Sequence, residues 1–137
     1  MTEPDYAPPD PPKHLHATGR GCWTELCVEF ELEDADDLRI LALGCQALDR
    51  AAQAGRVLRN DGLYWTDRLG NVRPHPAIAT EAKSRASAAQ IIGQLQRSRL
   101  AYDRYELALE RQAAAQTPHE GTHGRRGGGL RRYGMAT

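Results

Sequence analysis

The chain has 137 residues, with 18 basic and 18 acidic side chains that leave a formal net charge of zero. Hydrophobic residues make up 40% of it but aromatic residues only 6%, which favours helices packed through small side chains over a large aromatic core. The length predicts one domain with tails, and no run approaches the ~18 apolar residues of a membrane span, so no membrane partner is expected.

The zero net charge conceals a strong segregation along the chain. Residues 1–49 hold 11 acidic and three basic side chains, residues 50–111 hold 11 basic and six acidic, and residues 112–137 hold four basic and one acidic. An acidic front and a basic back indicate two partners, or head-to-tail contact between copies. The alternative is that both halves are simply solvated faces.

Three cysteines, Cys22, Cys27 and Cys45, occur without an N-terminal apolar leader. This combination predicts reduced thiols and a cytoplasmic location. His14 and His16 precede the first two cysteines closely, but His-x-His followed by Cys-x4-Cys is not a standard zinc spacing. A buried thiol at Cys27 is the simpler interpretation, and we expect no metal and no cofactor.

The first elements in chain order are an arm and a short helix. Residues 1–12 contain five of the eight prolines and predict a disordered or extended arm. A helix is expected from about Gly21 to Phe30, because apolar side chains recur there at three and four residues: Trp23, Leu26, Cys27 and Phe30. Either Glu33 or Asp34 in the acidic segment that follows can cap the next helix.

A second helix is expected from about Asp34 to Asn60. Its apolar and small residues alternate in steps of three and four, close to a heptad seam, at Leu38, Leu41, Cys45, Leu48, Ala52 and Gly55. Such a seam requires a partner helix, which either the same chain or another subunit can supply.

A β-hairpin is expected after Gly62, which ends the second helix in the left-handed conformation. Leu63–Thr66 favours a strand, Asp67–Gly70 forms a type I turn with glycine at the positive-φ position, and Pro74 blocks extension of the returning strand. The aromatic side chains Tyr64 and Trp65 either fold onto their own helices or insert into a neighbouring subunit.

A third helix begins near Pro76, because proline is favoured in a first turn. Its predicted stripe is narrow and rich in alanine: Ile78, Ala82, Ala86, Ala89, Ile92 and Leu95. No break occurs before Thr117, so either the helix ends near Ser98 or its C-terminal part packs against another subunit. The resulting fold class is mainly α, with a short helix ahead of two long antiparallel helices joined by a hairpin. The predicted segments are an arm (1–12), a helical domain (13–111) and a disordered Gly/Arg-rich tail (112–137).

From Pro12 to Leu95 the chain resembles the small subunit of phage terminase, the machine that packages viral DNA. The resemblance rests on the spacing of several motifs: Pro12-Lys-His-Leu, Gly21-Cys-Trp-Thr-Glu-Leu, Phe30-Glu-Leu-Glu, the hairpin Tyr64-Trp-Thr-Asp-Arg-Leu-Gly, and His75-Pro-Ala. It implies a non-enzymatic ring homo-oligomer in the bacterial host cytoplasm. Such a protein recognises double-stranded packaging-site DNA and recruits the large subunit, which carries the ATPase and nuclease. The chain departs from the pattern at residues 94–100, where the helix continues, and in its acidic front half.

The residues predicted to bind DNA are arginines, whose guanidinium groups bind phosphate bidentately. They lie in the tail, the hairpin and the last helix: Arg125, Arg126, Arg131, Arg132, Arg68, Arg73, Arg97 and Arg99. A solvated helix face and a solubilising tail are the alternatives for these groups. The predicted oligomer interface comprises apolar side chains of both long helices and the hairpin: Leu38, Leu41, Cys45, Leu48, Trp65, Ile78 and Ile92.

No catalytic residues are expected. The acids of Glu31–Asp37 are consecutive and radiate from a helix start, whereas a two-metal nuclease needs carboxylates that converge in a cleft. The sequence has no Gly-x4-Gly-Lys phosphate loop. Two other functions stay open, namely a small dimeric DNA-binding transcriptional regulator and a structural phage adaptor without DNA contact.

Overall fold

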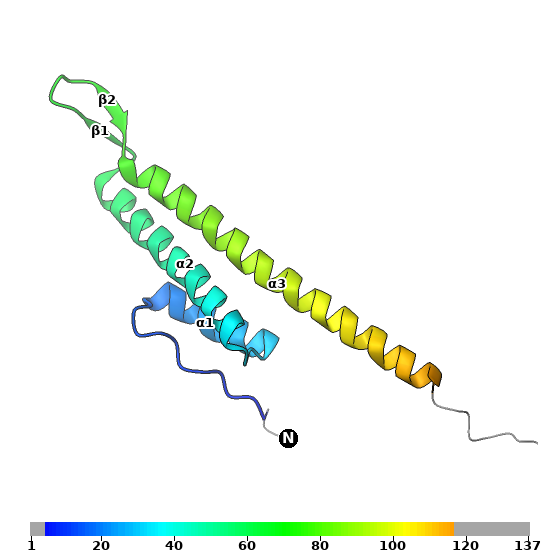
Figure 1. Cartoon of the computed structure of the whole chain (residues 1–137). Coiled ribbons are helices and arrows are strands. Elements are labelled where there is room, and N and C mark those ends of the chain that lie inside the picture. The colour runs from blue at the N-terminus through cyan, green and yellow to red at the C-terminus, as the bar shows by residue number, and fades with distance from the viewer. Residues whose placement is uncertain (1–4, 117–137) are drawn as a thin grey trace, which may run out of the picture. The chain divides into compact units, whose positions relative to one another are not determined.

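The computed structural model describes residues 5–116, which form three helices and one hairpin (Figure 1). The element order is α1 (Ala17–Phe30), α2 (Ala35–Asp61), β1 (Tyr64–Thr66), β2 (Val72–Pro74) and α3 (Pro76–Gln116). The predicted mainly α class, with a small antiparallel hairpin between two long helices, is confirmed.

Helix α1 begins four residues earlier than predicted, at Ala17 instead of Gly21. The cause is a carboxylate from α2. The Asp49 side chain accepts hydrogen bonds from the backbone N–H groups of His16 and Gly19, each at 2.7 Å, and so caps the first turn. Gly19 is required there, because a Cβ would lie 2.8 Å from the Cys45 carbonyl oxygen and overlap the Asp49 carboxylate.

Most local signals that bound α2 and the hairpin are confirmed. Asp34 caps α2 by accepting from the N–H of Asp36 at 2.8 Å. Gly62 ends α2 with a positive φ of 83°, as expected of glycine, but its ψ of 172° differs from the predicted left-handed conformation. The strands pair antiparallel, with Trp65 opposite Arg73, and Gly70 has the expected positive φ of 82°.

The hydrophobic core lies where α1, α2 and α3 meet. Trp23, Leu26 and Cys27 are buried as predicted, and the core also includes Leu15, Leu32, Leu41, Cys45 and Leu95. The proline-rich arm covers this core as an extended segment. Its Tyr6 hydroxyl donates to the Leu32 carbonyl at 2.7 Å, and its Pro9 carbonyl accepts from the indole N–H of Trp23 at 2.8 Å.

The predicted stripe of α3 is partly wrong. Ala82, Ala86 and Ala89 are exposed, whereas Ala88 and Leu95 are buried. On the N-terminal side of Ala88, the inner face of α3 includes polar residues. One of them is Glu81, whose side chain lies over the backbone of Gly55 in α2. The helical period of the inner face is therefore hard to see from hydrophobicity alone. Closer to the core, Gly44 of α2 brings the two long helices together, since a Cβ there would lie 3.0 Å from Ile92.

The chain divides after Ala101 into two compact units. The first contains α1, α2, the hairpin and α3 up to that residue. The described part of the second, residues 102–116, is helical and exposed throughout, so α3 does not end near Ser98. The apolar side chains exposed in this part are Tyr102, Tyr105, Leu107 and Leu109.

Candidate functional site

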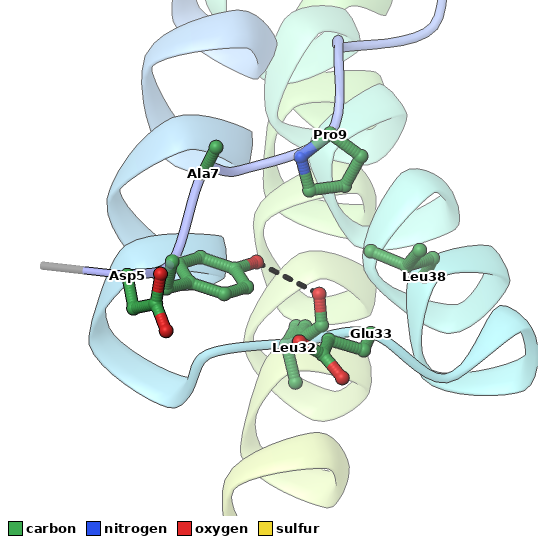
Figure 2. A pocket seen from close by; sticks show the side chains of 7 residues that line it. Asp5, Ala7, Pro9, Leu32, Glu33 and Leu38 are labelled. Atoms are coloured by element: carbon green, nitrogen blue, oxygen red, sulfur yellow. Dashed lines mark hydrogen bonds between the residues drawn. The ribbon is translucent and has the colours of Figure 1, made fainter.

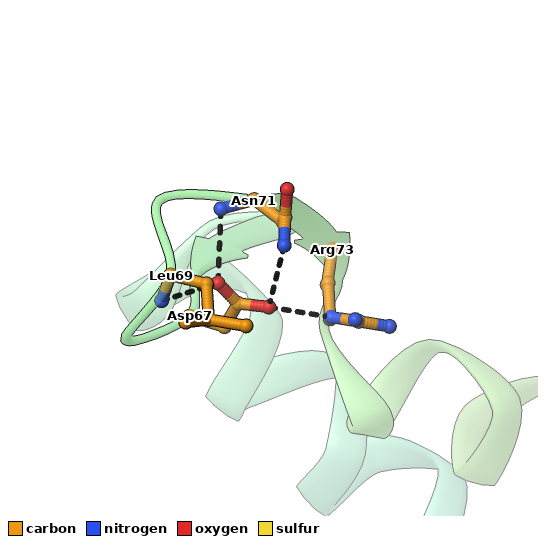
Figure 3. Close-up of polar contacts among 4 residues, drawn as sticks. All are labelled: Asp67, Leu69, Asn71 and Arg73. Atoms are coloured by element: carbon orange, nitrogen blue, oxygen red, sulfur yellow. Dashed lines mark hydrogen bonds and ion pairs between the residues drawn. The ribbon is translucent and has the colours of Figure 1, made fainter.

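The hairpin loop is organised around one carboxylate, that of Asp67 (Figure 3). It accepts the backbone N–H groups of Leu69 and Asn71, each at 2.9 Å, the Asn71 amide at 3.4 Å, and Arg73 Nε at 2.9 Å. Arg73 first, and then the backbone donors, lower the pKa of Asp67 below its usual range. All four donors belong to the hairpin itself, so the Asp67 carboxylate holds the turn through contacts within the hairpin.

The base of the hairpin is fixed by His75. Its ring Nδ1 accepts the N–H of Ala77 at 3.0 Å, which leaves Nε2 to donate to the Asp61 carboxylate at 3.2 Å. Its backbone N–H donates to the Leu63 carbonyl at 2.7 Å. These bonds connect the end of α2, the start of β1 and the first turn of α3, so they orient the hairpin against both long helices.

The hairpin nevertheless exposes its large apolar side chains on both faces. Every residue of β1 and β2 is exposed, and Leu69 at the tip is 86% exposed. The full set of exposed apolar residues is Leu63, Tyr64, Trp65, Leu69 and Val72. Tryptophan, tyrosine and arginine are enriched among the residues that dominate protein–protein interfaces, and this hairpin carries Tyr64, Trp65 and Arg68 in solvent. We call these five residues together with Arg68 the hairpin knob.

The structure separates the arginines predicted to bind DNA. Arg68 is exposed at the hairpin turn, and Arg73 is paired with Asp67 while its side chain stays 59% exposed. Arg97 is exposed on α3, about 30 Å along the helix from Pro76. Arg99 is half-buried and donates to the Phe30 carbonyl at 2.9 Å, so it also joins α3 to the end of α1. The four tail arginines lie outside the described residues: Arg125, Arg126, Arg131 and Arg132.

The residues predicted for the oligomer interface differ in their surroundings. Leu41 and Cys45 are fully buried in the core of a single chain. Trp65 alone among the seven is exposed, and four are half-buried: Leu38, Leu48, Ile78 and Ile92. Part of the α2 seam is therefore buried within a single chain, whereas Trp65 of the hairpin is exposed.

A pocket of about 380 Å³ lies between the arm and the start of α2 (Figure 2). Its walls combine apolar groups with two carboxylates: Asp5, Tyr6, Pro9, Leu32, Glu33 and Leu38. Sequence reasoning missed it, because the arm was predicted only as a disordered or extended segment. The lone aromatic in the arm, Tyr6, is the signal that could have shown where the arm attaches.

The three thiols have different environments. Cys22 is half-buried, and a hydrogen bond from the Cys45 thiol lowers its pKa. Cys45 is fully buried with a raised pKa, chiefly because of that same bond, and burial raises the pKa of Cys27. Among residues 5–116, no three His, Cys, Asp or Glu side chains gather in a way that could hold a metal ion.

Comparison of the chain with protein-family models, with curated proteins and with solved structures gives no match. Within the described part of the chain, no helix has both the length and the apolar character needed to cross a membrane.

Proposed function

We propose that this chain is the small subunit of a phage terminase, a ring-forming protein that binds packaging-site DNA and recruits the large subunit. In this role it is not an enzyme: the large subunit supplies the ATPase and nuclease. The proposed setting is the cytoplasm of the bacterial host.

The observation that best supports this proposal is the hairpin knob. Its apolar side chains are exposed on a turn that Asp67 and His75 hold in place, which favours contact with another protein over a role in the chain's own core. The helix–hairpin–helix order also matches the resemblance to terminase small subunits described above. Exposed arginines on the hairpin and on α3, repeated in every copy, would give a ring many weak phosphate contacts that act together.

A dimeric regulator would need a recognition helix whose first turn meets DNA bases. The only described helix that follows a short turn after another helix is α2, and its first turn carries Asp36 and Asp37 behind the capping carboxylate of Asp34. These three charges would repel phosphate. The regulator therefore finds less support than the terminase subunit.

The experiment is duplex DNA binding by fluorescence anisotropy over a salt series, using the full-length chain. A slope of log affinity against log salt counts the phosphates that the protein neutralises. Arg97→Gln should reduce the slope, whereas Arg39→Gln should leave it unchanged, because exposed Arg39 lies in the acidic half beside Asp36. The salt slope of a chain that lacks residues 117–137 measures how many of the phosphate contacts these residues contribute.

Salt-dependent binding that weakens with Arg97→Gln and with loss of the tail supports the proposal. A full-length chain that shows no salt-dependent affinity for duplex DNA would contradict it and favour an adaptor. An unchanged slope after removal of the tail would exclude the tail arginines from the DNA contact.

A further inference from the structure

An exposed apolar hairpin and a pocket lie at opposite ends of α2. The hairpin knob follows the last residue of α2, and the pocket beneath the arm lies beside its first turn. With 27 residues at 1.5 Å each, α2 separates them by about 40 Å. A hairpin therefore cannot reach the pocket of its own chain.

The charges at the two ends are complementary. Residues 29–37, of which Leu32 and Glu33 line the pocket, contain six acidic and no basic side chains. Residues 56–85, which carry the hairpin, contain six basic and three acidic side chains, and two of those acids, Asp67 and Glu81, are already paired with arginines of the same segment. Each end thus favours the opposite end of another copy over a second copy of itself.

We propose that the hairpin knob of one copy inserts into the arm pocket of the next copy. Leu69, the most exposed apolar side chain, enters the apolar part of the pocket between Tyr6, Pro9 and Leu38, and Arg68 beside it pairs with Glu33 at the rim. The occupant is a second copy of this chain, because its hairpin end combines exposed apolar side chains with a basic charge balance, which matches a pocket that has apolar walls and two carboxylates.

This contact is heterologous: each copy offers one knob and one pocket. Repeated around a closed rotation it produces a ring, and the arm becomes part of the subunit interface. The closure of the copies into a ring rests on the proposed function, whereas the contact between two copies does not. It also gives the segregated charge a physical role, namely to orient the copies head to tail.

The first test measures self-association of the full-length chain by sedimentation velocity. Leu69→Ser should raise the apparent dissociation constant at least about ten-fold, because the interface loses a buried leucine side chain. Leu43→Ser is the matched control: this leucine is 58% exposed on α2, belongs to neither the pocket lining nor the hairpin knob, and its replacement should leave association unchanged. Far-UV circular dichroism should match wild type for both variants, since both side chains are exposed.

The second test exchanges charge. Arg68→Glu alone and Glu33→Arg alone should each weaken assembly, because like charges then meet at the joint. An equimolar mixture of the two variants should reassemble, since every mixed joint is complementary, and so should the R68E/E33R double variant. A merely destabilising substitution would not be rescued in this way.

The outcomes separate the contact from the function. If wild type assembles and binds DNA while Leu69→Ser assembles equally well, or the mixture stays dissociated, the knob-in-pocket contact is wrong and the proposed function stands. If wild type is a monomer that does not bind duplex DNA, both are wrong. The contact is supported if assembly is lost with Leu69→Ser, retained with Leu43→Ser and restored by mixing the two charge variants.

Discussion

Two glycines of α1, only two residues apart, should respond to alanine with opposite signs. Gly21 faces open space, with no atom within 4 Å of an added Cβ, so Gly21→Ala should stabilise the fold by about 0.5–1 kcal/mol through the unfolded state. Gly19 faces α2, where an added Cβ would overlap the Asp49 carboxylate and lie 2.8 Å from a backbone oxygen of Cys45.

The cost at Gly19 follows from what must move. If the Asp49 side chain is displaced, its two 2.7 Å hydrogen bonds to the start of α1 are lost or lengthened, which costs about 3 kcal/mol in all. The alanine gain offsets up to about 1 kcal/mol of this. We therefore expect Gly19→Ala to destabilise by about 2 kcal/mol, and the two variants to differ by about 3 kcal/mol.

Urea unfolding followed by far-UV circular dichroism, at one fixed protein concentration, measures both changes. The expected result is a higher midpoint for Gly21→Ala and a lower one for Gly19→Ala. Equal midpoints for the two variants would refute the idea that Asp49 and Gly19 form a tight contact between α1 and α2.

Three further results are expected. Asp49→Ala should lower the free energy of unfolding in urea by about 3 kcal/mol, because it removes two hydrogen bonds to backbone donors. Asp34→Ala removes an exposed cap with one such bond and should lower it by about 1 kcal/mol. Equal losses would contradict the long-range cap. In the folded protein only Cys22 should react quickly with iodoacetamide, since the other thiols are buried, and rapid labelling of all three by mass spectrometry would argue otherwise. The folded-state pKa of Asp67 lies below its ordinary 3.8. The support that this carboxylate gives the hairpin is therefore complete above about pH 4 and is lost as the pH falls through the lowered pKa. Amide resonances of the loop that stay unchanged during this titration would disprove that support.

The parts of the fold that local chemistry determines could be predicted. Gly62 and Gly70 have the positive φ values that their positions required, Asp34 caps α2, and α3 begins at Pro76. Each of these signals acts on the backbone within a few residues, so the residue that causes the feature lies next to it in the sequence. The apolar face of α1 was also correct, since three of its four members are buried.

The parts that depend on distant residues could not be predicted. The start of α1 is set by Asp49, 30 residues beyond Gly19, and an aspartate inside an apolar periodic segment gives no sign of which backbone it will cap. The inner stripe of α3 was misplaced because Glu81 lies on it, opposite Gly55. The arm pocket depends on two long-range hydrogen bonds, from the Tyr6 hydroxyl to the Leu32 carbonyl and from the Trp23 indole N–H to the Pro9 carbonyl.

Native mass spectrometry of the full-length chain, with and without a DNA duplex, tests the central claim most directly. The account predicts one discrete species larger than a dimer, which takes up duplex DNA without loss of subunits. A chain that stays monomeric or dimeric under both conditions would contradict the ring-forming, DNA-binding role.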